Sequence, residues 1–232
     1  MSSGVERPGD RAVAVGDGDQ VAEGVVDLLG ALAYGELSAF DRLAEDARMA
    51  PTLTGRAALA RMAAAEIDHH CRLTARLTEL GAEPTAAMSP FVPAPDAFHD
   101  STRPRTWLEG LVKAYVGDGL ASDFYREIAG FLPDPDRALI LEVLADTGHA
   151  DFAVREVRAA IATDRTLSGR LALWGRRLVG EAMRQSQAVI AERDQLAELI
   201  LEGTGDLSGI GRLVDRITTA HTERMKTLGL NP

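Results

Sequence analysis

The sequence predicts an all-α protein: a four-helix bundle with a long crossover between its second and third helices, extended by one or two C-terminal helices. Three observations support this prediction. Alanine, leucine, arginine and glutamate are abundant, and aromatic residues make up only 5% of the 232 residues, which favours helices over strands. Apolar residues recur every three or four positions over long stretches. A proline-rich segment divides these stretches into two halves.

Six helical segments are expected from this periodicity. The turns after the first and third segments are short and contain proline, so each half of the bundle is expected to form an antiparallel hairpin. The fifth segment and the weaker sixth exceed the four-helix minimum, and they could either cover one side of the bundle or form a homodimer contact. The expected ranges are about Asp19 to Arg48, Thr54 to Leu80, Thr106 to Leu132, Asp134 to Ala162, Leu167 to Leu201 and Leu207 to Leu228.

Local signals set the ends of several helices. Thr106 and Glu109 have the spacing of a capping box at the start of the third helix. Asp134 followed by Pro135 predicts an N-cap and a first helical position for the fourth. The crossover, residues 82–105, contains five prolines and is therefore expected not to be helical.

Composition limits the kind of protein this chain can be. Residues 1–18 are polar and glycine-rich, which predicts a disordered N-terminal tail before a single domain over residues 19–232. The tail lacks the features of a signal peptide, and no apolar run is long enough to cross a membrane. The single cysteine, Cys71, excludes an internal disulfide. These features, with a net charge of −10 that disfavours nonspecific binding to nucleic acid, predict a cytoplasmic protein without membrane contact.

One pattern of carboxylate and histidine residues occurs twice along the chain. Each copy has an acidic residue on one helix and an acid-x-x-His pair on the next, and corresponding positions lie 82, 80 and 80 residues apart. In a four-helix bundle, such residues can converge on one pair of metal ions. The six candidate ligands are Glu36, Glu66 and His69 in the first copy, and Asp118, Asp146 and His149 in the second.

The candidate ligands lie in the apolar stripes of their helices. Glu66 and His69 continue the spacing of Leu59, Met62 and Leu73 on the second helix, and the other four ligands have similar neighbours. Four carboxylates in one core would repel one another and lose hydration. Two divalent cations would cancel their charge, so the sequence predicts a dinuclear site. The alternative is a core in which the buried acids and histidines pair with arginines.

Several other residues resemble parts of a site but favour a simpler interpretation. A third acid-x-x-His match, Asp96 to His99, falls in the proline-rich crossover and is interpreted as a coincidence. His70 points about 100° away from His69 around the helix, so it is not expected to be a ligand. His221 is expected to be solvated outside the bundle. Arg170, Arg177 and Arg184, with Arg176 adjacent, form an arginine stripe in the fifth helix that could meet the phosphates of a nucleic acid, but an ion-paired or solvated face is favoured.

Glycines cluster beside the candidate ligands, inside helices where each costs about 1 kcal/mol relative to alanine. They are Gly35, Gly117, Gly119 and Gly148. Their role could be close helix packing, a channel for substrate or dioxygen, or a local distortion of the helix.

At the candidate ligands the sequence resembles the ferritin-like family that includes the bacterial tRNA 2-methylthio-N6-isopentenyladenosine hydroxylase, in its actinobacterial branch. The resemblance runs from about residue 21 to 200. It implies that Glu36 and Asp118 are terminal ligands, that Glu66 and Asp146 bridge the metals, and that each histidine binds one metal. The second set departs from the family in having aspartate, one methylene shorter than glutamate, and Glu142, one turn earlier, is a reserve ligand. The stretches that carry the resemblance are Leu32 to Glu36, Met62 to His69, Lys113 to Gly119 and Leu144 to His149.

Carboxylates with two imidazoles suit Fe(II), and Mn(II) also fits. Two ferrous ions can supply electrons to dioxygen, so the resemblance implies a dioxygen-dependent hydroxylase (monooxygenase), with an external reductase and a prenylated tRNA nucleoside or another small apolar group as substrate. Tyr34 and Tyr115, each within a turn of a ligand, could hydrogen-bond to that ligand. One alternative function is a metal-binding, iron-handling protein without an organic substrate. Another is a degenerate bundle that serves as an interaction module.

Overall fold

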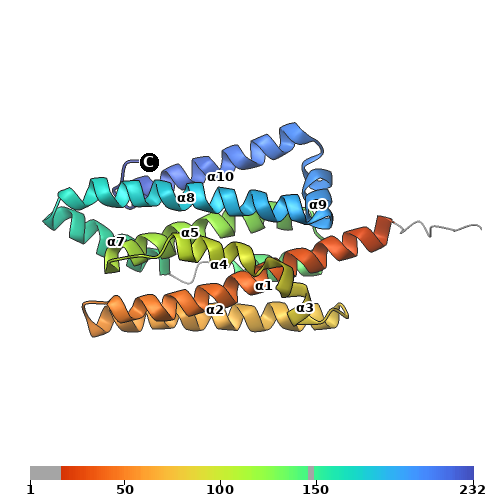
Figure 1. Ribbon diagram of the computed structural model, residues 1–232, viewed down its shortest axis with the longest axis horizontal. Helices are drawn as coiled ribbons and strands as arrows, with labels where there is room; N and C mark the ends of the chain where they lie inside the picture. The colour runs from red at the N-terminus through yellow and green to blue at the C-terminus, as the bar shows by residue number, and fades with distance from the viewer. Residues whose placement is uncertain (1–16, 146–148) are drawn as a thin grey trace, which may run out of the picture.

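The computed structural model describes residues 17–145 and 149–232, and within these ranges every regular element is a helix (Figure 1). The prediction of an all-α bundle is confirmed. The elements in chain order are α1 (Asp17–Asp46), η1 (Ala47–Met49), α2 (Leu53–Glu79), α3 (Pro84–Met88), η2 (Ser89–Phe91), α4 (Pro93–Ser101), α5 (Trp107–Ala129), α6 (Asp134–Val143), α7 (His149–Thr163), α8 (Thr166–Glu192), α9 (Asp194–Thr204) and α10 (Leu207–Thr227). Of the predicted tail, residues 1–16 lie outside the described ranges, and Asp17 and Gly18 are the first residues of α1.

The long helices lie nearly parallel to one axis in three tiers (Figure 1). α1 and α2 form an antiparallel hairpin on one side, α5 lies in the middle, and α8 and α10 cover α5 from the other side. The C-terminal helices therefore cover the bundle, as one of the two sequence-based alternatives expected. None of the described helices is long and apolar enough to cross a membrane.

Two apolar clusters make up the core. One contains Leu28 and Leu32 of α1 with Leu73 of α2, and it extends to α6 and α9. The other contains Leu43 of α1 with Leu59 of α2, and it extends to α7, α8 and α10. Both clusters span α1, α2 and α5, so each of these helices passes from one cluster to the other along its length.

Side-chain caps fix the starts of two bundle helices. Thr52 Oγ1 accepts a hydrogen bond from the Gly55 amide at 3.1 Å, and Thr106 Oγ1 accepts one from the Glu109 amide at 3.3 Å. The Thr106 half of the predicted capping box is therefore present. The other half differs, because the Glu109 carboxylate accepts a hydrogen bond from the Arg105 amide, at 2.7 Å, and not from the Thr106 amide. The predicted N-cap at Asp134 is wrong: α6 already includes Asp134, and its N-cap Pro133 has no side-chain hydrogen bond to offer.

The expectation of a non-helical crossover is wrong. This segment contains α3, η2 and α4, each with a proline in its first turn. Proline is tolerated there because the first amides of a helix have no partner within the helix. Glu83 caps α3, and its carboxylate accepts from the amides of Thr85 and Ala86 at 3.1 and 2.6 Å.

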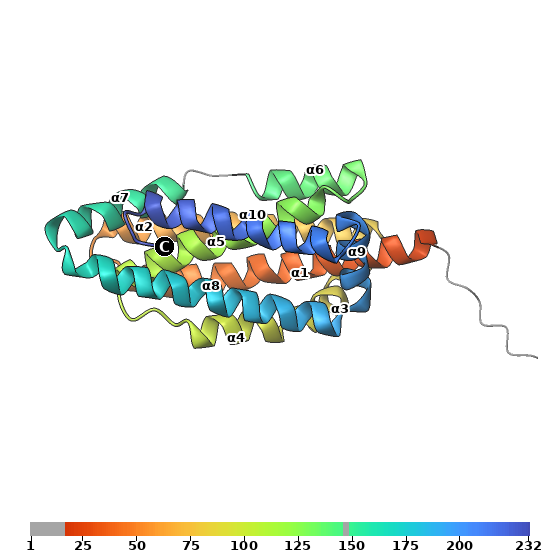
Figure 2. The same cartoon turned by 90° about the horizontal axis from the view of Figure 1, so that it is seen from above.

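Two of the predicted long helices are each divided in two. The fourth is divided into α6, which ends at Val143, and α7, which begins at His149, and Figure 2 shows the two at separate positions along the bundle. The fifth breaks at Arg193, which has φ −126° and ψ 89°. The Arg193 guanidinium donates to both carboxylate oxygens of Asp27 on α1, at 3.1 and 2.5 Å. This pair holds the break against α1, and α9 then turns to pack on α1 and α10.

Gly30 brings α1 and α3 into close contact, because a Cβ at this position would lie 2.4 Å from the Ala87 carbonyl oxygen. We expect Gly30→Ala to lower the free energy of unfolding by about 1 to 3 kcal/mol, since the backbone of α3 must move. Gly180→Ala on α8 is the matched control. It has no atom within 4 Å of its Cβ position, and it should raise stability by up to about 1 kcal/mol. Urea denaturation measures both, and equal stability of the two variants would contradict the close packing.

Candidate metal centre

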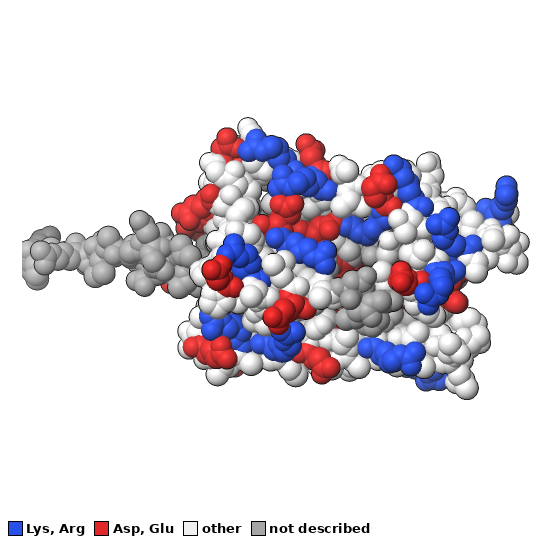
Figure 3. Space-filling model, turned by 180° about the vertical axis from the view of Figure 1, so that it is seen from behind, with Lys and Arg blue, Asp and Glu red and all other residues white. Residues whose placement is uncertain are grey.

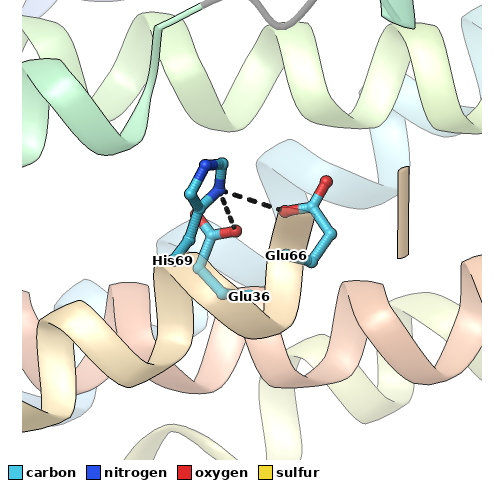
Figure 4. A group of neighbouring side chains, drawn as sticks. All are labelled: Glu36, Glu66 and His69. Atoms are coloured by element: carbon cyan, nitrogen blue, oxygen red, sulfur yellow. Dashed lines mark hydrogen bonds and ion pairs between the residues drawn. The ribbon is translucent and has the colours of Figure 1, made fainter. Parts of the chain in front are cut away.

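Three of the six candidate ligands come together between α1 and α2. Glu36 projects from α1 and Glu66 and His69 from α2, toward the same space (Figure 4). One ligand atom from each residue lies within 4.8 Å of the others, which is close enough for a single metal ion to bind all three. Among the described residues, this is the only group of three or more metal-binding side chains.

The group lies where the two apolar clusters meet. On α1, Ala33 belongs to one cluster and Leu43 to the other, with Glu36 between them. On α2, Ala63 and Leu73 belong to different clusters, and both Glu66 and His69 lie between them. The helical periodicity that buries the apolar residues therefore also turns these polar side chains inward.

His69 joins the two carboxylates. Its Nδ1 atom lies 3.4 Å from Glu36 Oε2 and 3.7 Å from Glu66 Oε2. Glu36 is 8% exposed, whereas Glu66 and His69 are half-buried. In this arrangement a proton on Nδ1 can be shared between both carboxylates, and a cation can take the same place.

Burial and the charges of neighbouring groups shift the pKa values of Glu36 and His69. Burial raises the pKa of Glu36 well above its ordinary value, and the Glu66 carboxylate raises it further. The Glu36 and Glu66 carboxylates raise the pKa of His69, because they stabilise its protonated form. The buried Glu36 carboxylate beside the half-buried Glu66 carboxylate thus requires a proton or another compensating positive charge. The donor set of oxygen and imidazole nitrogen fits a divalent ion such as Fe(II) or Mn(II).

His70 has a structural role, in agreement with the sequence-based interpretation. Its Nδ1 atom lies 2.8 Å from the Ala33 carbonyl oxygen. A carbonyl oxygen can only accept, so Nδ1 donates and the hydrogen bond ties α2 to α1 next to Glu36.

The second set of predicted ligands is not assembled in the same way within the described residues. Asp118 is exposed on α5 and is not a member of the group around His69. Asp146 and the side chain of His149 lie outside the described residues. The reserve ligand Glu142 is exposed, and its carboxylate pairs with the Arg72 guanidinium, joining α6 to α2. The roles of these four residues stay predictions.

Tyr34 contacts a different partner from the one expected. Its hydroxyl donates to Asp96 Oδ1 at 2.7 Å, which joins α1 to α4. Asp96 and His99 both lie on α4, whereas the sequence analysis expected them in a non-helical crossover. Tyr115 is half-buried on α5.

Tyr125 is a neighbour of the site that sequence reasoning did not single out. Burial raises the pKa of its hydroxyl, and the Glu36 carboxylate raises it further, so the two groups are within electrostatic range. On α5, Leu120 and Ile128 belong to different apolar clusters, which places Tyr125 at the same junction as Glu36. Its position in the apolar stripe of α5 was the available signal.

The glycines beside the ligands have different environments. A Cβ at Gly35 or Gly117 would meet no atom within 4 Å, so close packing does not explain either residue. At Gly119 a Cβ would overlap the Arg224 side chain, which donates to the Gly119 carbonyl oxygen at 3.0 Å. Gly148 lies outside the described residues.

Two further expectations concern the C-terminal helices. The solvated position expected for His221 is wrong: it is 5% exposed on α10, because α10 packs on α5 and α9. The arginines of the stripe on α8 pair with other groups of the same chain. Arg184 pairs with Glu181, Arg177 donates to the Ser101 carbonyl oxygen at 2.5 Å, and Arg176 donates to the Asn231 carbonyl oxygen at 3.0 Å.

The fold and the carboxylate–histidine group are those of a ferritin-like helical bundle. A family model described as a ferritin-like domain of actinomycetes matches residues 19–203, and the chain belongs to this family. The solved structure of "Protein 19 with aldehyde deformylating oxidase activity from Synechococcus" superposes with a TM-score of 0.65 at 19% identity, over 91% of this chain and 92% of that one. This structural similarity supports the assignment of the fold. A comparison with curated proteins found no significant match.

We expect Glu66→Gln to weaken Co(II) or Fe(II) binding more than about 10-fold, because even residues that only support a metal ligand often contribute that much. Anaerobic titration of metal-free protein, followed by visible absorption for Co(II), measures the affinity. Glu79→Gln is the matched control: Glu79 lies on the same helix, and its exposed carboxylate pairs with Arg76 at 2.9 Å. Equal affinities for the two variants would mean that Glu66 is not a ligand.

Proposed function

We propose that this protein is a dioxygen-dependent oxidoreductase with two iron ions per chain. The convergence of Glu36, Glu66 and His69 at the junction of two apolar clusters carries the proposal. These residues would bind one ion, with Glu66 as a bridging ligand. Mn(II) fits the same donors.

Asp118, Asp146 and His149 would bind the second ion in this proposal. The described residues on either side support this location, because Leu144 belongs to one apolar cluster and Ala153 to the other, and the two clusters meet at His69. Asp118 and Tyr125 lie two turns apart on α5, and Asp118 would need to turn inward on metal binding.

When bound, a pair of ferrous ions would supply two electrons to dioxygen and the substrate C–H bond the other two, so that, with two protons, one oxygen atom enters the C–H bond and the other leaves as water; the external reductase would restore the ferrous state. The protein residues supply the environment. The apolar clusters on both sides of Glu36 limit access of water. Burial and the Glu36 carboxylate raise the pKa of Tyr125, so its hydroxyl stays protonated beside the site to a higher pH than that of an ordinary tyrosine and is a possible hydrogen-bond donor.

The proposed reaction is hydroxylation of a small apolar group, with electrons from an external reductase. The resemblance of the sequence to the family of the tRNA isopentenyladenosine hydroxylase supports a prenylated tRNA nucleoside, whose prenyl chain would be this apolar group. The structural neighbour is named for activity on an aldehyde. On the face shown in Figure 3, basic and acidic side chains are interspersed, so this face has no continuous basic surface for tRNA phosphates.

A second candidate function is iron handling without an organic substrate. The side chains of Glu66 and His69 keep 14% and 17% exposure, so an ion bound there could exchange with solvent. Such a protein would release or mineralise ferric ion, whereas a hydroxylase would retain its iron through each cycle.

Iron content of protein purified anaerobically with Fe(II) tests the proposal. We expect about two irons per chain, as in dinuclear carboxylate bundles, and loss of iron in both Glu66→Ala and Asp146→Ala. Glu79→Ala should retain the wild-type content. One iron or none in the wild type would contradict the dinuclear proposal.

Oxygen uptake by the iron-loaded protein separates the two functions. With a reductant, a hydroxylase is expected to consume oxygen in proportion to product when the correct apolar substrate is present. Uptake that depends only on added Fe(II), accompanied by ferric ion in solution or as a mineral, would support iron handling. If Glu66→Ala and His149→Ala change neither iron content nor oxygen uptake, both metal-based functions are wrong and the bundle acts as an interaction module.

A further inference from the structure

A cavity of about 350 Å³ lies beside the end of α1, away from the metal centre. η1, α4, the loop after α4 and α5 complete its walls. Arg42 and Asp46 are six and ten residues beyond Glu36, which corresponds to about 9 and 15 Å along the helix axis. The cavity is lined by Arg42, Glu45, Asp46, Arg48, Met49, His99, Arg103, Pro104 and Lys113.

Positive charge dominates the lining. Four basic side chains, those of Arg42, Arg48, Arg103 and Lys113, face two carboxylates, those of Glu45 and Asp46. Glu45 is already paired, because its Oε2 accepts from Arg42 Nη1 at 3.3 Å. Burial raises the pKa of Asp46 to about 6, so Asp46 is still mainly ionised at pH 7, and the four basic side chains exceed the two carboxylates by two charges.

Lys113 is the most unusual residue of this cavity. Lysine side chains normally lie at the protein surface, whereas Lys113 is only 6% exposed. Its Nζ atom donates to the Thr102 carbonyl oxygen at 2.9 Å and lies 5.3 Å from the centre of the Phe98 ring. An ammonium group has three hydrogens to donate. Burial lowers the pKa of Lys113 to about 8, so the group is still mainly charged at pH 7.

Two further polar atoms of the lining residues are buried and have no hydrogen-bond partner: His99 Nδ1 and Arg42 Nε. Burial lowers the pKa of His99 to about 3, so its ring is neutral at pH 7 and offers one donor and one acceptor. A buried donor without a partner is unfavourable. Three side chains around one cavity therefore have hydrogen-bonding capacity that a ligand could use.

We propose that this cavity binds a small oxyanion, the carboxylate or phosphate group of a ligand, through Lys113, Arg42 and His99. An anion would neutralise the excess positive charge and accept from the unpaired donors. Guanidinium groups match the planar geometry of carboxylate and phosphate oxygens, and Lys113 would act as a point charge beneath them. The site is separate from the metal centre, so the proposal does not depend on the proposed function.

Isothermal titration calorimetry at pH 7 with inorganic phosphate and, separately, with acetate tests the proposal on the full chain. We expect saturable binding of one anion per chain, and at least a 10-fold loss of affinity in Arg42→Met and Lys113→Met. Tighter binding of phosphate identifies a phosphate-carrying ligand, and tighter binding of acetate identifies a carboxylate.

Arg137→Met is the matched control. Like Arg42, Arg137 pairs with a carboxylate three residues away, Asp134, but it lies on α6 and does not line this cavity. Its affinity for the anion should equal that of the wild type. Arg42 is partly exposed, so Arg42→Met keeps the test valid if Lys113→Met does not fold. Absence of saturable binding of both anions, or equal affinity in Arg42→Met and the wild type, would overturn the proposal.

Discussion

The buried carboxylate of Glu36 is the constraint on which the rest of this structure depends. A carboxylate that has lost most of its water needs a positive charge or a proton nearby. Here His69 and Glu66 from the neighbouring helix surround it, and His70 fixes the two helices together through Ala33. A bundle selected only for stability would have apolar residues at this junction. The polar group between two apolar clusters is thus best explained by metal binding.

The parts of the fold that follow from local chemistry were predictable. Periodicity predicted α1, α2, α5 and α10, and the same periodicity turned Glu36, Glu66 and His69 inward. Thr106 capped α5 as expected, because its hydroxyl and the Glu109 amide are close in sequence. The first half of the repeated ligand pattern was predictable for the same reason: each helix places its own residues, and one short turn brings the two helices together.

Other features depend on contacts between residues that are distant in sequence. The break at Arg193 is held by Asp27, which is 166 residues away. His221 is buried because α10 folds back along α5, and its spacing of four residues from both Ile217 and Met225, on the buried face of α10, was the available signal. The prediction for the crossover is wrong for another reason: it interprets the prolines as helix breakers, although four of the five lie in the first turn of a short helix, where proline is favourable.

We propose that Glu36, Glu66 and His69 bind iron directly. Anomalous X-ray scattering at the iron absorption edge, from crystals grown anaerobically with Fe(II), tests it most directly. We expect an iron peak within bonding distance of a His69 nitrogen and of an oxygen of each carboxylate, with a second peak about 3.5 to 4 Å from the first. Iron bound only elsewhere, with His69 still paired to the carboxylates, would contradict it.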